Sequence, residues 1–227
     1  MAPGWVIFIR RNMARNEMVG GIRITPGNER HQGVGAYLYV SRRIDEADRY
    51  TMDWLRSIHQ AISSIYRDGH PESLEDYLER LNLPSITYGS GGIRLPNADS
   101  SAKHTAGLIA RQVMKADIAS DFRLRDEDGI VADQRSGGIE FTIDRDDIER
   151  DIYDFTGALW DSPHVPHGWK RTSHAHLTVG SAPERAKSAE EKADFDGRIK
   201  EAMLAHPLGD VALTHLEFMY WEPQASM

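Results

Sequence analysis

Short runs of aromatic and β-branched residues alternate along this chain with segments whose hydrophobic residues recur every three to four positions. The first pattern is typical of strands and the second of amphipathic helices. We predict strands at 5–9, 18–26, 35–40, 85–89, 175–180 and 211–221, with two or three more within 121–144. We predict helices at 46–66, after Ser73, at 101–115, at 146–160 and after the capping box Ser188-Ala-Glu-Glu191.

This succession of strands and helices favours an α+β or α/β fold with mixed sheets over a helical bundle or a β-sandwich. The chain has 227 residues, and its sequence contains no low-complexity tract or long linker. A chain of that length forms one large domain or two small ones. We therefore treat residues 1–227 as a single domain.

Composition and charge narrow the classes of function. The chain has no cysteine, which excludes disulfides, thiolate metal sites and a cysteine nucleophile, and it fits a reducing compartment. The net charge of −8 argues against a sequence-independent binder of duplex DNA, which needs a broad basic surface. No run approaches the ~18 apolar residues of a membrane span, and the N-terminal pattern does not predict a signal peptide. We expect a cytoplasmic protein with no membrane partner.

Candidate chemistry is concentrated in the predicted strand at 175–180, Ala-His-Leu-Thr-Val-Gly. Residues i and i+2 of a strand point to the same face, so His174, His176 and Thr178 share one face and the apolar residues share the other. A strand at the edge of a sheet has the same appearance, so this segment alone leaves both interpretations open.

A second stretch has the same design. Pro84-Ser-Ile-Thr-Tyr-Gly89 repeats the order of polar residue, aliphatic, threonine, hydrophobic and glycine, and a helix is predicted after each copy. Paired His-x-Thr strands of this kind resemble the two-histidine (2H) phosphoesterases, and the second half of the chain looks most like the 2′,3′-cyclic nucleotide 3′-phosphodiesterases. The resemblance spans about residues 83–222, which carry both motifs. Residues 1–82 would then be an enlarged N-terminal part of the first lobe.

The resemblance implies a bilobal α+β fold, in which two antiparallel sheets flank a central cleft and helices lie outside. It also implies metal-independent hydrolysis of a 2′,3′-cyclic phosphate on a nucleotide or RNA end, or of a related 2′–5′ or cyclic oligonucleotide, usually to a 2′-phosphate. One imidazole takes the water proton and a second protonates the leaving oxygen. His176 would be one acid/base residue, and Thr178 and Thr87 would bind the phosphate oxygens. No cofactor is expected.

The first motif departs from the family pattern, because Ser85 stands where a histidine is expected. A serine hydroxyl cannot exchange a proton near neutral pH as an imidazole does. Three explanations are open: an engineered replacement of histidine, a natural protein that binds a nucleotide without cleaving it, or another histidine in the same role. His104 is a candidate for the last, although it falls on the helix predicted after the strand.

Several residues near the second motif are candidates for substrate binding. Local cations favour a phosphate, and an aromatic ring can stack on a base. These candidates are His174, Lys170, Arg171, Tyr220 and Trp221. The alternative for each is that the side chain is only exposed to solvent or packed in the core and does not bind substrate. His164 and His167, with the two motif histidines, also raise the possibility of zinc, but no carboxylate or cysteine stands at a standard ligand interval. We expect no metal.

Overall fold

Strands and helices alternate along the chain as the hydrophobic pattern predicts. The structure is a computed structural model, and the residues described are 17–27, 35–66, 84–116, 118–119, 121–131, 138–165, 168–181 and 188–223. The strands are β1 (Glu17–Val19), β2 (Ile22–Pro26), β3 (Tyr37–Ile44), β4 (Ser85–Gly92), β5 (Phe122–Leu124), β6 (Gly129–Val131), β7 (Gly138–Ile143), β8 (Lys170–Arg171), β9 (His176–Ser181) and β10 (Val211–Trp221). The α-helices are α2 (Arg49–Tyr66), α4 (Ala102–Val113), α5 (Asp146–Trp160) and α6 (Ala189–Ala205).

The predicted elements at 5–9 and after Ser73 lie outside the described residues. The cap predicted for α6 is confirmed, because the Ser188 side chain accepts a hydrogen bond from the backbone N–H of Glu191. The single strand expected at 18–26 is instead a hairpin of β1 and β2. Gly20 and Gly21 form its turn with φ angles of 56° and 89°, a conformation that glycine adopts without steric strain.

The strands form one ten-stranded sheet, in the order β1-β2-β10-β3-β4-β9-β7-β6, with β5 paired to β10 and β8 to β4. The α+β class is therefore confirmed. The observed sheet differs in two ways from the two antiparallel sheets that the resemblance implies. Strands β2 and β10 run parallel, and β4 and β9 hydrogen-bond at Ile86 and Leu177, where they approach closely enough to join the two halves.

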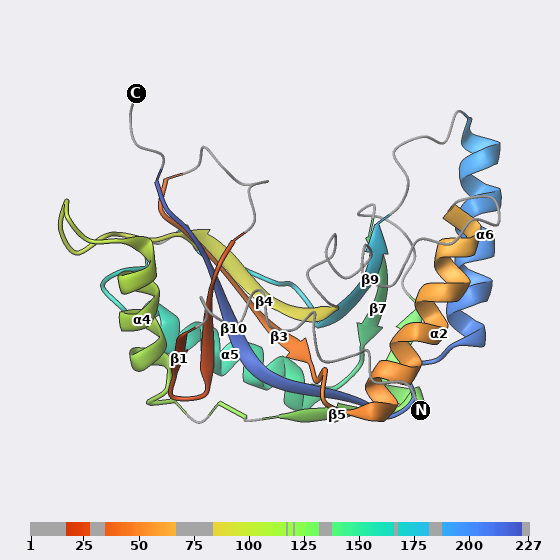
Figure 1. Cartoon of the computed structure of the whole chain (residues 1–227), viewed down its shortest axis with the longest axis horizontal. Helices are drawn as coiled ribbons and strands as arrows, with labels where there is room; N and C mark the ends of the chain where they lie inside the picture. Colours follow the sequence, from red (N-terminus) through yellow and green to blue (C-terminus); the bar gives the residue numbers. More distant parts are fainter. Residues whose placement is uncertain are drawn as a thin grey trace, which may run out of the picture.

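The sheet is strongly curved (Figure 1). Helices α4 and α5 lie on the outer side of β10, β3 and β4, and α2 and α6 lie on the outer side of β7 and β9. Hydrophobic side chains from the strands pack against these helices; for example, Phe155 of α5 contacts both Tyr88 of β4 and Phe218 of β10 edge-on. We call the opposite, concave side of the sheet the inner face.

A buried polar cluster beneath β4 anchors helix α5 to the sheet. The Arg42 side chain donates to the Tyr88 hydroxyl at 2.8 Å and forms an ion pair with Asp151 at 3.1 Å. The Tyr88 hydroxyl also donates to Asp151, and burial raises the pKa of Tyr88 far above its ordinary value. Tyr88 therefore has a packing role on the outer face, as its alternation with Thr87 predicts.

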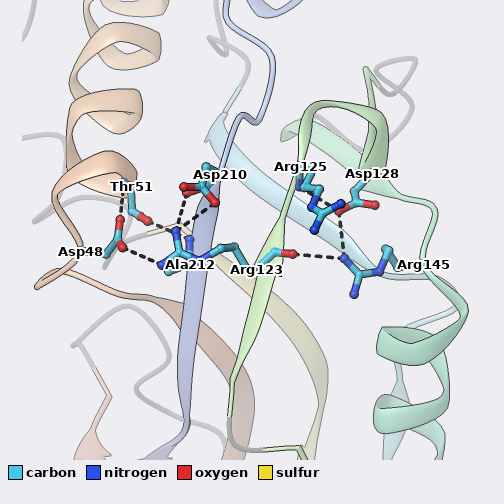
Figure 2. A network of polar contacts seen from close by, with 8 residues as sticks. All are labelled: Asp48, Thr51, Arg123, Arg125, Asp128, Arg145, Asp210 and Ala212. Atoms are coloured by element: carbon cyan, nitrogen blue, oxygen red, sulfur yellow. Dashed lines mark hydrogen bonds and ion pairs between the residues drawn. The ribbon is translucent and has the colours of Figure 1, made fainter.

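A second polar network joins the start of α2 to the starts of β5 and β10 (Figure 2). Arg123 bridges Asp48 at 2.8 Å and Asp210 at 3.0 Å, while the backbone N–H of Ala212 donates to Thr51. On the other side of the network, the Arg145 side chain donates to the backbone carbonyl of Arg123. The hydrogen bond from the Thr51 N–H, followed by Arg123, lowers the pKa of Asp48 below its ordinary value.

The lowered pKa makes the contribution of Asp48 to stability dependent on pH. A carboxyl whose pKa is lower in the folded than in the unfolded state stabilises the protein above the unfolded value of about 3.8, and this stability is lost as the pH falls through the folded pKa. We expect Asp48→Asn to unfold at slightly lower urea concentration than the wild type at pH 7, with the difference shrinking as the pH falls below 3.8. Exposed Asp154→Asn on α5 controls for loss of one charge. A difference that does not shrink on acidification would contradict the ion-pair explanation.

Candidate functional site

Polar and buried residues alternate on β4 and β9 as the sequence predicts. Ser85 and Thr87 are partly exposed on the inner face, whereas the intervening Ile86 is completely buried. His176 and Thr178 are likewise partly exposed on β9, and the residues between and beside them are buried in the core. Both strands thus bury one face against the outer helices and present the other face on the inner side.

The two strands meet at these motifs. β4 and β9 run antiparallel, with Ile86 opposite Leu177. Extending this register by one residue in each direction sets Ser85 against Thr178 and Thr87 against His176. Residues directly opposite in such a pair are about 5 Å apart and diagonal neighbours about 7–8 Å. The structure therefore brings the four predicted site residues onto one small area of the inner face.

The ring of His176 is oriented by its own chain. Its Nδ1 atom lies 3.1 Å from the backbone carbonyl oxygen of His174. Since a carbonyl only accepts, Nδ1 carries the proton in this contact and Nε2 keeps its lone pair. An imidazole held in that tautomer can accept a proton at Nε2 from a bound water molecule.

The two motif threonines have different partners. The Thr87 Oγ1 atom lies 2.6 Å from the hydroxyl of Tyr39 on β3, and either group can be the donor. When Tyr39 donates, the Thr87 proton is available for a ligand oxygen. Thr178 donates to Glu140 of β7 at 3.3 Å, so its hydroxyl must rotate to donate to a phosphate.

Charged side chains continue the site along β3 and β10. Arg43 lies opposite Ser85 in the register of β3 and β4 and forms a buried ion pair with Glu217 of β10. The hydroxyl of Thr25 on β2 donates to Glu217 at 2.7 Å. This arrangement places a guanidinium beside the serine of the first motif.

His215 lies next to this ion pair on β10. Burial, followed by the charge of Arg23, lowers its pKa to about 4, so the ring is neutral at physiological pH. Within the described part of the chain, the His215 Nε2 and the Arg43 Nε atoms are buried and have no hydrogen-bond partner. Buried polar atoms in native proteins are usually hydrogen-bonded to protein or water, so each of these two nitrogens is a position where an ordered water molecule would be a suitable partner.

The structure divides the predicted substrate-binding residues between the two faces of the sheet. The ring of His174 lies 5.8 Å from that of His176, and Lys170 is opposite Ser90, which the Tyr37 hydroxyl contacts. Arg171 is on the other face, where its guanidinium stacks 5.3 Å from the ring centre of Tyr153 on α5.

The two aromatic candidates at the end of β10 also point in opposite directions. Trp221 is opposite Tyr37 and contacts its ring edge-on, with 6.0 Å between ring centres. Tyr220 is opposite Leu38 and packs against the hydrophobic core on the helix-bearing face. Of the pair, Trp221 is the one on the side of the motif residues, but it is largely buried.

Another histidine named by the sequence lies on one of the outer helices. His104 lies on α4, which packs on the outer side of β10, and His167 lies outside the described residues. Among the described residues, no three histidine, aspartate or glutamate side chains are grouped so that they could bind a metal ion. None of the described helices is long and apolar enough to cross a membrane.

Four residues of the site were not predicted from the sequence: Tyr39, Arg43, Glu140 and Glu217. Tyr39, Arg43 and Glu140 lie on strands next to β4 or β9, and Glu217 contacts Arg43 from β10. Period-two alternation could have indicated Tyr39 and Glu140. The chain matches no known protein-family model and no curated protein sequence. The functional interpretation therefore depends on the geometry of the site and on the resemblance of its motifs.

Proposed function

We propose that the inner face at β4 and β9 binds and hydrolyses a 2′,3′-cyclic phosphate, on a nucleotide or RNA end or in a related 2′–5′ or cyclic oligonucleotide. The observation that carries this proposal is the antiparallel meeting of the two similar strands at Ile86 and Leu177. A pairing of this kind gives the two motifs approximate twofold symmetry around one point. A phosphoryl group at that point would have hydroxyl groups from both strands within reach.

The arrangement of the sheet also supports a two-lobed, 2H-like fold. One half, from β1 to β4, has α4 and α5 on its outer side, and the other half, from β9 to β6, has α2 and α6 (Figure 1). The register that joins the halves is one residue pair long. We propose that each half corresponds to one lobe of the family fold.

In the proposed reaction, His176 accepts the proton of the attacking water at Nε2. The water oxygen bonds to phosphorus as the bond from phosphorus to one ribose oxygen breaks. Thr87 and Thr178 hydrogen-bond to the non-bridging oxygens, whose negative charge grows in the transition state. The proposed product is a 2′-phosphate, as the resemblance to the cyclic nucleotide phosphodiesterases implies.

A second function, nucleotide binding without cleavage, is favoured by one specific observation. Ser85 stands at the position of the second acid/base histidine and cannot perform its proton transfer near neutral pH. The hydroxyl groups, the guanidinium of Arg43 and the imidazole of His176 would still be able to bind a phosphate. In that case the protein would sequester or sense a nucleotide.

Replacing Ser85 by histidine tests the two functions directly. We expect Ser85→His to raise the rate of 2′,3′-cyclic nucleotide hydrolysis, measured with excess chelator, by tens of fold up to ~10²-fold, because it restores a group that exchanges protons near neutral pH. Adding His176→Ala should abolish the gain.

No gain, together with thermal stabilisation of the wild type by a 2′-nucleotide, would favour the binding function. Absence of both hydrolysis and stabilisation with every nucleotide tested would contradict the proposed site.

A further inference from the structure

Tyr39 is an ionisable side chain in direct contact with the first motif. It extends along the inner face from β3, where its backbone lies opposite Ser90. Its hydroxyl oxygen is 2.6 Å from Thr87 Oγ1. Burial raises the pKa of Tyr39 above its ordinary value of 10.0, and the nearby hydroxyls of Thr87 and Ser85 partly oppose this effect.

The protonation state of this phenol suits an acid rather than a base. A tyrosine whose pKa is raised above 10.0 stays protonated throughout the neutral range. A phenol is a much stronger acid than a ribose hydroxyl, so it can protonate an alkoxide as that leaving group departs. Arg43, whose charge favours the phenolate, lies opposite Ser85 and can stabilise the negative charge that forms on the tyrosine oxygen.

We propose that Tyr39 takes the place of the missing second histidine and donates the proton to the leaving ribose oxygen; this inference rests on the proposed function. As water bonds to phosphorus, His176 accepts the water proton and the bond between phosphorus and the ribose oxygen breaks. The phenolic proton of Tyr39 passes to that oxygen, and in this step Tyr39 accepts a hydrogen bond from Thr87 instead of donating to it. The imidazolium of His176 and the phenolate of Tyr39 then return to their starting states by proton exchange through water.

The chain contains a matched control for this role. Tyr37 is also on the inner face of β3, two residues away, but its hydroxyl donates to Ser90 at 2.8 Å instead of contacting a motif residue. Tyr37→Phe removes the same atom from the same strand. A general effect of losing a tyrosine hydroxyl on β3 would appear in both variants.

The test is a double-mutant cycle on hydrolysis of a 2′,3′-cyclic nucleotide, with chelator present. The four proteins are the wild type, Tyr39→Phe, Ser85→His and the variant with both changes. We expect Tyr39→Phe to lower the rate of the wild type by about 100-fold, as for loss of a general acid. In the Ser85→His background the same change should cost less than about threefold, because a histidine then donates the proton and the two effects are not additive. Tyr37→Phe should match the wild type.

Any other result of this cycle would contradict the role of Tyr39, and the pattern of rates shows which assumption is wrong. An equal loss from Tyr39→Phe in both backgrounds would show that Tyr39 only supports the fold of the site, and no loss in either would remove any role. If the wild type is inactive and Ser85→His is active, Tyr39 does not replace the histidine, although the proposed site stands. If both are inactive, the proposed function itself is wrong, and the inference with it. Activity of the doubly changed protein also demonstrates that Tyr39→Phe folds.

The dependence of the rate on pH gives an independent readout. With a phenol as the acid, the wild-type rate should not fall between neutral pH and about pH 9, because the pKa of Tyr39 is raised above its ordinary value of 10.0. Ser85→His should instead give a bell-shaped profile, because one histidine must be neutral and the other protonated. A bell-shaped wild-type profile, with its fall near neutral pH, would contradict the role of Tyr39.

Discussion

Replacing His176 by alanine is expected to lower the rate of cyclic phosphate hydrolysis by about 10²–10⁴-fold, the usual effect of removing a general base. The expected loss is this large because the structure holds the ring in one tautomer. The contact of 3.1 Å from Nδ1 to the carbonyl of His174 leaves Nε2 as the proton acceptor. The rate should be measured with saturating substrate and chelator, so that a change in binding or contaminating metal does not affect the result.

His174→Ala is the matched control. The ring of His174 is exposed and lies 5.8 Å from that of His176, while the contact that orients His176 comes from the backbone carbonyl of residue 174, which alanine retains. We expect a much smaller loss of rate from this variant. Equal losses from the two variants would mean that His176 has no special role, and an unchanged rate in His176→Ala would contradict the proposed mechanism.

Replacing Arg42 by methionine is expected to lower the free energy of unfolding by about 3–5 kcal/mol, the range found when one partner of a buried ion pair is removed. The Arg42 side chain is 1% exposed and that of Asp151 5%. Arg42 also donates to the backbone carbonyls of Thr214 and Ala119 at 3.0 and 2.8 Å. Methionine would leave the buried Asp151 carboxylate without its guanidinium, and urea unfolding at pH 7 would measure the loss.

Two further variants make this prediction specific. Combining Arg42→Met with Asp151→Leu should destabilise the protein less than the sum of the two single changes, because no unpaired charge remains buried. Arg49→Met removes an arginine from an exposed pair with Asp53 on α2 and should have almost no effect. If Arg42→Met lowered the free energy of unfolding as little as Arg49→Met does, the buried cluster would not hold α5 to the sheet.

The sequence was most informative about features that depend on neighbouring residues. Period-two alternation placed Ser85 with Thr87 and His176 with Thr178, each pair on the face opposite the core, because successive side chains of a strand point to opposite sides. Helix α4 begins beside Ser101, and α6 is capped by Ser188, because these caps need only a side-chain oxygen and a backbone N–H three residues later.

The alternation of polar and apolar residues does not predict which way a side chain points where both faces of a strand are buried. Residues 40–44 of β3 are all buried, so their polarity does not distinguish the inner from the outer face. Arg42 points outward to Asp151 and Arg43 inward to Glu217. Neither carboxylate is within 100 residues of its arginine in sequence, and the sequence contains no signal for either pair.

The sequence by itself thus determined the α+β class, most of the described helices and strands, and the two polar motifs. Tertiary structure alone decided that β4 and β9 pair at Ile86 and Leu177, that the two halves form one curved sheet, and that Tyr39 reaches Thr87. The physical reason is that strand register depends on packing and hydrogen bonds between residues far apart in sequence, whereas alternation, turns and caps depend on residues a few positions apart.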